Sequence, residues 1–298
     1  MSSKYKIYAA AVTPFTEDGM PDGDSMAKML KRLYRHGLDG AFIFGTMGEW
    51  GQLDPEERAL LLERAAATAA EENGELLVGI SANSLHLTLR TLEESMKFPG
   101  TAFVVMLPGI RTSQLDPVTY FHTVCDASDR PVYYYHAPAN NNLQLSSEQI
   151  ARMASHPKCA GIKNSAGSMN LRKELLLHRQ SGNFRLLEGH EWAIDEALML
   201  GCDGAVCGIG ALAAKPLAQM AEAAEAGDWD TLRRIQFKLL PLFKAVYGTT
   251  SWLGQKYALK TLGIISSAHC RIQPESMLSA ARRQEIEDYL KDNIAFLE

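Results

Sequence analysis

The chain has 298 residues, of which 46% are hydrophobic and 22% are charged. This length and composition are those of a globular protein with a large core, and they exclude a disordered or fibrous chain. The formal net charge of −5 is spread along the sequence without a basic stripe. Nucleic acid and anionic membranes are therefore poor candidates as partners, and we expect a small-molecule partner.

The first apolar run, residues 7–12, is followed closely by Pro14. It is too short for the core of a signal peptide or for a membrane-spanning helix, so we expect a cytoplasmic protein. The five cysteines are scattered and form no C-x-x-C pair. We interpret them as buried free thiols.

Short apolar segments with strand-forming residues recur along the chain, and helix-start signals lie between several of them. The candidate strands are residues 7–12, 41–44, 76–80, 102–106, 131–135, 159–163, 184–188 and 204–208. Asp54 with Glu57 and Ser146 with Gln149 have the spacing of capping boxes, and Asp116 precedes a proline at a helix start. The pattern predicts helices after residues 54, 116 and 146.

Alternating strands and helices predict an α/β protein, a (β/α)8 TIM barrel over residues 1–225 that contains the active site. An open doubly wound sheet is the alternative, but no G-x-G-x-x-G follows the first strand. Beyond Lys215 the strand signal ends, and segments 228–246, 252–262 and 275–296 read as helices. We expect a C-terminal helical region, residues 226–298, packed on the barrel.

Lys163 directly follows an apolar strand. Chemistry in such barrels takes place at the C-terminal ends of the strands, where this amine would enter a partly desolvated cavity. Desolvation favours the neutral amine, whose lone pair can attack a ketone and form a Schiff base. The alternative is a lysine that reaches the barrel mouth or pairs with Glu49 or Glu191.

Tyr135 ends the neighbouring fifth strand, and its phenol could transfer protons beside Lys163. It could equally be a core residue at the end of an aromatic run. The loop Gly45-Thr46-Met47-Gly48 offers closely spaced backbone N–H groups that could hold a carboxylate. Alternatively, its glycines could serve only to permit an unusual turn.

Together these motifs closely resemble, in order and spacing, the dihydrodipicolinate synthase/N-acetylneuraminate lyase family of pyruvate-dependent class I aldolases. The resemblance runs through Thr13-Pro14-Phe15, Gly45 to Glu49, Leu53, Glu56-Glu57-Arg58, Tyr135-His136-Ala137-Pro138, Gly161-Ile162-Lys163 and Gly201-Cys202-Asp203-Gly204.

By this resemblance Lys163 is the Schiff-base lysine, Tyr135 the proton-transfer residue and Thr46 its hydrogen-bond partner. The backbone amides of Thr46 and Met47 would bind the substrate carboxylate, and the main chain of Val206 would add a contact. The resemblance also implies a homo-oligomer, a tetramer or dimer, and chemistry without a metal or organic cofactor.

Several positions depart from dihydrodipicolinate synthase itself and argue against that activity. Leu107-Pro108-Gly109-Ile110 replaces a stretch in which that enzyme has a tyrosine that reaches the neighbouring subunit's site, and Asn140 replaces an arginine that holds a second carboxylate. A neutral amide disfavours a semialdehyde with its own carboxylate. His136 and Met47 also differ from the usual residues and are expected to alter the pocket.

The expected pocket combines amide, hydroxyl and carboxylate groups, which suits a hydroxyl-rich substrate. The candidate lining residues are Trp50, Asn83, Asn140, Ser165, His190 and Glu191. Glu191 lies near a carboxylate that sialic acid lyases and sugar-acid aldolases use for substrate hydroxyls. It could instead be a solvated loop residue.

We therefore expect a carbon–carbon lyase that reversibly cleaves a 2-oxo acid, of the 2-keto-3-deoxy sugar acid or 4-hydroxy-2-oxo acid type, to pyruvate and an aldehyde. A condensing enzyme like dihydrodipicolinate synthase, or a Schiff-base hydratase or dehydratase, would use the same lysine. Two alternatives come from other classes. One is a metal-dependent enolising lyase with Glu49, His136, His190 and Glu191 as ligands, and the other is a non-catalytic barrel that binds 2-oxo acids.

Overall fold

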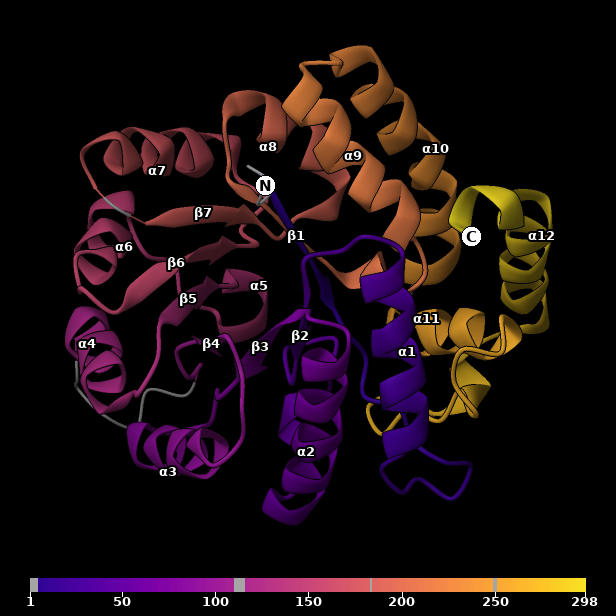
Figure 1. The fold of residues 1–298 in the computed structure, drawn as a ribbon, viewed down its shortest axis with the longest axis horizontal. Coiled ribbons are helices and arrows are strands. Elements are labelled where there is room, and N and C mark those ends of the chain that lie inside the picture. The colour runs from indigo at the N-terminus through magenta and orange to yellow at the C-terminus, as the bar shows by residue number, and fades with distance from the viewer. Residues whose placement is uncertain (1–4, 110–115, 183, 249–250) are drawn as a thin grey trace.

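The computed structural model describes residues 5–109, 116–182, 184–248 and 251–298, and its strands close into a parallel barrel (Figure 1). The strands are β1 (Lys6–Ala10), β2 (Gly40–Ile43), β3 (Glu75–Gly79), β4 (Ala102–Val105), β5 (Val132–His136), β6 (Cys159–Asn164), β7 (Arg185–Glu188) and β8 (Gly204–Cys207). Because β1 pairs with both β2 and β8, the sheet has no free edge. The predicted TIM barrel is confirmed, and the open sheet is excluded.

Helices surround the barrel and fill the connections between its strands (Figure 1). They are α1 (Gly23–Arg35), α2 (Pro55–Glu71), α3 (Leu85–Met96), α4 (Pro117–Ala127), the short α5 (Pro138–Asn141), α6 (Ser147–Ala154), α7 (Met169–Ser181) and α8 (Ile194–Leu200). The predicted helix starts are correct. Asp54 with Glu57 and Ser146 with Gln149 form complete capping boxes, and the Asp116 carboxylate accepts from two N–H groups of the first turn of α4.

The C-terminal helices α9 (Ala214–Ala226), α10 (Trp229–Tyr247), α11 (Ser251–Thr261) and α12 (Ala280–Leu297) follow β8, as expected. Helix α12 begins later than predicted because the Ser279 side chain caps it, and Glu275–Met277 forms a separate 3-10 turn. Helix α10 packs on α9, α11 and α12. A domain boundary between residues 225 and 226 stays a prediction.

The side chains of each strand alternate between the barrel interior and the helix layer. On β5, Tyr133 and Tyr135 belong to the interior cluster with Tyr8, whereas Tyr134 packs outward against Phe121 of α4. At the N-terminal end of the barrel, the Tyr8 hydroxyl donates to Glu75 at 2.6 Å. This end is therefore filled, and the open end is the one at which the strands finish.

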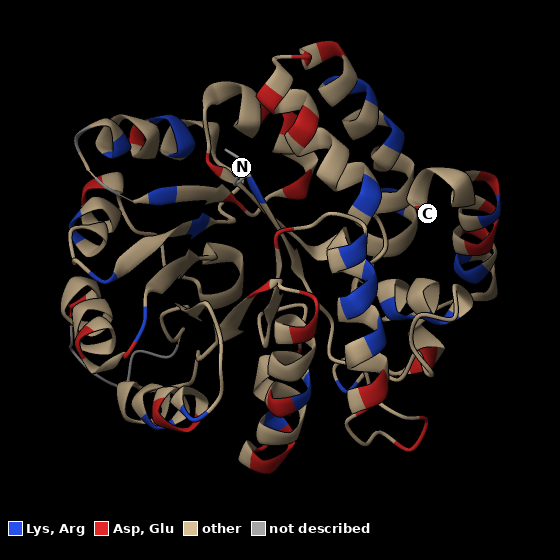
Figure 2. Ribbon diagram, in the orientation of Figure 1, with Lys and Arg blue, Asp and Glu red and all other residues tan. Residues whose placement is uncertain are grey.

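Charged residues of both signs lie mainly on the outer helices and loops (Figure 2). None of the helices in the described ranges combines the length and apolar character needed to cross a membrane. The five cysteines are buried and unpaired, as predicted.

Candidate active site

Lys163 and Tyr135 are direct partners across β6 and β5 at the C-terminal end of the barrel. The pairing shifts by one residue between Val132 and Tyr133, and from there Tyr133 pairs with Gly161 and Tyr135 with Lys163. Both side chains are buried, with exposed fractions of 5% and 6%. Paired residues of parallel strands share a face, so the phenol and the amine enter the same cavity.

The Lys163 amine lies against aromatic rings and has no carboxylate partner among the residues that the structure describes. Its Nζ is 4.1 Å from the centroid of the Tyr135 ring and 4.8 Å from that of Phe42. Glu49, one of its two possible partners, instead forms a buried ion pair with Lys256. The amine is therefore buried inside the barrel, where a ketone could reach it, and it does not extend to the barrel mouth.

The Tyr135 hydroxyl is held by hydrogen bonds with Thr46, Ser165 and the Lys163 amine. Burial is the largest single influence on the pKa of Tyr135 and raises it. The charge of Lys163 and these hydrogen bonds together outweigh burial, so the pKa of Tyr135 lies below its ordinary value. The Thr46 oxygen in turn accepts from Asn140 Nδ2 at 2.9 Å. A chain of hydrogen bonds therefore links Asn140 to the phenol through Thr46.

The loop after β2 turns sharply between residues 45 and 49. The left-handed positions are Phe44 and Glu49, with φ of 55° and 52°, and not the two glycines. A Cβ on Gly48 would lie 2.8 Å from the Phe44 nitrogen, so this glycine is required for space. The N–H groups of Thr46 and Met47 donate to no acceptor in the described part of the chain. They are available to a ligand.

Two glycines that directly follow β7 and β8 lie where the candidate site leaves no room for a side chain. A Cβ on Gly189 would overlap Ser165 Oγ and lie 3.1 Å from Lys163 Cε. A Cβ on Gly208 would overlap the Tyr247 hydroxyl and lie 3.0 Å from a Glu191 oxygen. The absence of a Cβ at these positions therefore gives the Ser165 and Tyr247 hydroxyls the room that they occupy.

Glu191 is anchored and is not a solvated loop residue. The Ile209 N–H donates to its Oε1 at 2.9 Å, and the Tyr247 hydroxyl donates to its Oε2 at 2.5 Å. Burial raises the pKa of Glu191, and these donors and Lys163 oppose the rise. The carboxylate borders a cavity of about 750 Å³ whose lining includes Met47, Gly189, His190, Glu191, Tyr247 and Arg282.

Three of the other predicted lining residues border a different cavity, whereas Ser165 lies beside Tyr135 and Gly189. Trp50, Asn83 and Asn140 line a second cavity of about 180 Å³, together with the segment 106–109 after β4. Ile110, the last residue of the stretch 107–110 that differs from dihydrodipicolinate synthase, lies outside the described residues. Val206 lies in the interior cluster with Tyr135.

His136 does not take part in this pocket, so the expectation that it alters the pocket is wrong. It follows the inward-facing Tyr135 on β5 and lies on the outward face, where the Tyr134 hydroxyl and its Nδ1 are 3.2 Å apart. The four ligands proposed for a metal-dependent lyase do not come together. Within the described ranges, no group of three or more His, Cys, Asp or Glu side chains is arranged to hold a metal ion.

Three neighbours of the site were missed in the sequence. Phe42 could have been predicted from the alternation of side chains along β2, which turns Phe42 into the barrel interior. Tyr247 and Trp252 lie in the C-terminal helices, and Trp252 Nε1 donates to the Thr46 carbonyl at 2.8 Å. No local sequence pattern predicts a contact between segments that lie so far apart in the chain.

Burial of His136 makes the free energy of unfolding depend on pH between two definite values. Burial lowers the pKa of His136 from 6.5 to about 4, so the unfolded chain binds this proton first as the pH falls. The free energy of unfolding should therefore decrease between pH 6.5 and 4, by at most about 3 kcal/mol from this residue. Urea unfolding of wild type and His136→Asn across this range measures the difference.

The exposed His86 provides the control, since His86→Asn should keep the wild-type pH dependence. Equal slopes for wild type and His136→Asn would contradict the buried neutral imidazole.

Known proteins of one family match this chain over nearly its whole length. The model of the Dihydrodipicolinate synthetase family matches residues 4–293. A 4-hydroxy-tetrahydrodipicolinate synthase from Haloarcula marismortui is 27% identical over 293 residues, which cover 98% of this chain and 93% of the relative. One from Kineococcus radiotolerans is 28% identical, with 89% of this chain and 85% of the relative covered.

Solved structures share the fold. The dihydrodipicolinate synthase from Acinetobacter baumannii complexed with pyruvate has a TM-score of 0.89 at 22% identity, covering 97% of this chain and 99% of that one. YagE, a prophage protein of the dihydrodipicolinic acid synthase family from E. coli K12 in complex with pyruvate, has a TM-score of 0.89 at 24% identity, covering 97% and 98%. Because the family model spans nearly all of the sequence, the chain belongs to the dihydrodipicolinate synthetase family.

Proposed function

We propose that this protein is a class I aldolase that cleaves a hydroxylated 2-oxo acid to pyruvate and an aldehyde, with Lys163 as the Schiff-base residue. The observation that carries the proposal is the buried Lys163 amine, which lies opposite Tyr135 and has no carboxylate partner among the described residues. A phenol with a lowered pKa beside an amine is suited to the proton transfers of imine chemistry.

In this mechanism, Lys163 Nζ attacks the ketone carbon, and Tyr135 moves protons so that water leaves and a protonated imine forms. The substrate carboxylate would accept from the Thr46 and Met47 N–H groups. Tyr135 then takes the proton from the C4 hydroxyl, the C3–C4 bond breaks, and its electron pair enters the imine to give an enamine. The aldehyde departs, C3 of the enamine is protonated, and water hydrolyses the imine to release pyruvate and the free amine.

The polar groups beside the lysine support a hydroxyl-rich aldehyde portion. Glu191 and His190 supply hydrogen-bonding groups to the cavity of about 750 Å³, and Ser165 supplies a hydroxyl beside Tyr135. The Glu191 carboxylate is already oriented by Tyr247. Oriented hydrogen-bonding groups of this kind select for substrate hydroxyls. A 2-keto-3-deoxy sugar acid or a 4-hydroxy-2-oxo acid fits this description.

The curated relatives carry the name of a condensing synthase, which is the main competing activity. Asn140 argues against it, because this residue is neutral and its amide donates to Thr46. A second substrate carboxylate would find no cation at that position. A hydratase or dehydratase on the same lysine would release no aldehyde. A non-catalytic barrel would bind 2-oxo acids without turnover.

We also propose that the protein forms a homo-oligomer, a tetramer or dimer, and that it is located in the cytoplasm.

The proposal predicts pyruvate release from at least one member of a panel of 2-keto-3-deoxy sugar acids and 4-hydroxy-2-oxo acids. Pyruvate is measured with lactate dehydrogenase, and the aldehyde is identified by mass spectrometry. Lys163→Arg keeps the positive charge but should abolish release, because a guanidinium does not form the imine. Turnover without an aldehyde would support the hydratase instead, and condensation of pyruvate with a semialdehyde would support the synthase.

Thr46 should matter for turnover through its hydroxyl. Thr46→Val removes the link between Asn140 and Tyr135 while keeping the backbone N–H groups, so kcat should fall by about 100-fold with little change in KM. Because the Thr46 hydrogen bond lowers the pKa of Tyr135, the rising limb of the pH–rate profile should move to higher pH. Thr46→Ser retains a hydroxyl and should stay close to wild type. Equal activity of the Val and Ser variants would refute this role.

A further inference from the structure

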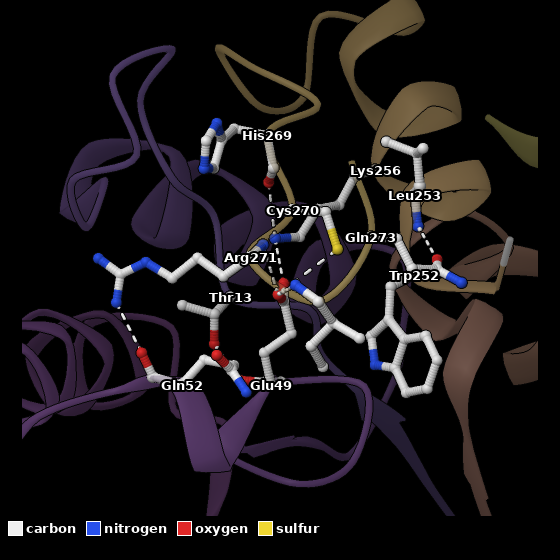
Figure 3. Close-up of polar contacts among 12 residues, drawn as sticks. Thr13, Glu49, Gln52, Trp252, Leu253, Lys256, His269, Cys270, Arg271 and Gln273 are labelled. Atoms are coloured by element: carbon white, nitrogen blue, oxygen red, sulfur yellow. Dashed lines mark hydrogen bonds and ion pairs between the residues drawn. The ribbon is translucent and has the colours of Figure 1, made fainter. Parts of the chain in front are cut away.

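Helix α11 reaches from the C-terminal region to the loop that follows β2, and it contacts both ends of the turn 46–49. Trp252 Nε1 donates to the Thr46 carbonyl at 2.8 Å. Lys256 forms an ion pair with Glu49 (Figure 3). Residues four positions apart share one face of a helix, so a single face of α11 holds the beginning and the end of this turn.

The Glu49 end of the turn is firmly fixed. The side chains of Glu49 and Lys256 are fully buried, and the Glu49 carboxylate also accepts from the Arg271 N–H at 2.9 Å (Figure 3). It accepts from the Ile272 N–H at 3.2 Å as well. Lys256 donates in addition to the His269 carbonyl at 2.9 Å. Removing one partner of such a pair is costly, because it leaves a buried charge without compensation.

The Thr46 end has a different consequence, because it sets the direction of a peptide group. The peptide bond between Thr46 and Met47 is planar and trans, so its carbonyl and its N–H point in opposite directions. The carbonyl is fixed by two donors, the Trp252 indole and the Glu49 N–H at 3.1 Å. The Met47 N–H must then point away from α11, and it has no acceptor within the described ranges.

We propose that Trp252 is a positioning residue for the carboxylate of the 2-oxo acid, acting through the Thr46–Met47 peptide group. Its indole N–H holds the Thr46 carbonyl and thereby directs the Met47 N–H to the substrate carboxylate. The inference rests on the proposed function, since it requires a 2-oxo acid bound at Lys163. It gives the C-terminal helices a direct part in substrate affinity.

Trp252 is also the anchor that can be altered with least disturbance. The Gly48 carbonyl is held separately by the Thr13 hydroxyl at 2.6 Å, and removal of Lys256 would leave the buried Glu49 carboxylate without its counter-charge. Trp252→Phe removes the N–H and leaves an aromatic side chain. The half-exposed Trp229, at the start of α10, allows the matched control Trp229→Phe.

The test compares two ketones that differ in the carboxylate. Wild type, Trp252→Phe and Trp229→Phe are reduced with borohydride at increasing concentrations of pyruvate or of hydroxyacetone, which has no carboxylate, and the labelled fraction is read by intact mass. Trp252→Phe should weaken the apparent affinity for pyruvate by about three- to tenfold, the loss expected for one oriented hydrogen bond. Labelling by hydroxyacetone should not change, and Trp229→Phe should behave as wild type.

A second substitution separates the N–H from the shape of the ring. Incorporation of 3-benzothienylalanine at position 252 replaces the indole N–H with sulfur in a ring system of nearly the same size, and it should reproduce the loss that is specific to pyruvate. An equal loss for both ketones, or no loss for either, would overturn the role of Trp252. A wild-type protein that traps no pyruvate would overturn the proposed function itself, whereas normal trapping with an unchanged variant would overturn only this inference.

Discussion

Tyr135 and Lys163 stand opposite each other because the pairing of β5 with β6 slips by one residue between Val132 and Tyr133. Without this shift, Lys163 would pair with His136. Since strand side chains alternate between faces, a slip of one residue exchanges the inward and outward sets. The irregularity therefore turns the phenol and the amine into the same cavity while Tyr134 and His136 pack against the helices. The hydrogen bonds from Thr46 and Ser165, and the close approach of Ser165 and Lys163 to Gly189, depend on this register.

Side chains of the C-terminal helices contact several of the loops that follow the strands at the C-terminal end of the barrel. Tyr247 of α10 orients the Glu191 carboxylate after β7, and Gln255 of α11 donates to the Gly208 carbonyl after β8. Trp252 and Lys256 hold the loop after β2. Residues from two consecutive helices, α10 and α11, thus set the positions of three strand-end loops. These helices are part of the architecture of the candidate site as well as a cover for the barrel.

Local signals in the sequence were sufficient for much of the fold. The strands, the capping boxes and the alternation of strands and helices are properties of short segments, and the structure agrees with them within a few residues. The error at His136 was avoidable, because an inward Tyr135 requires an outward neighbour on the same strand. The conformation of the glycine-rich loop 45–48 could not be predicted from local sequence. The left-handed residues on either side of it are Phe44 and Glu49, and the buried contacts that stabilise Glu49 come from residues 256 and 270–272, which no local pattern connects to it.

The residues of the proposed chemistry were found through their places at strand ends and through a family resemblance. Their neighbours Tyr247 and Trp252 were not, since contacts between remote segments depend on tertiary packing. The most direct test of the account is borohydride reduction of the protein with pyruvate, followed by intact mass and peptide mapping, with Lys163→Ala as the control. The account predicts one reduced pyruvate adduct confined to Lys163 and absent from the variant. An adduct on another lysine, or none under conditions that label a known class I aldolase, would contradict it.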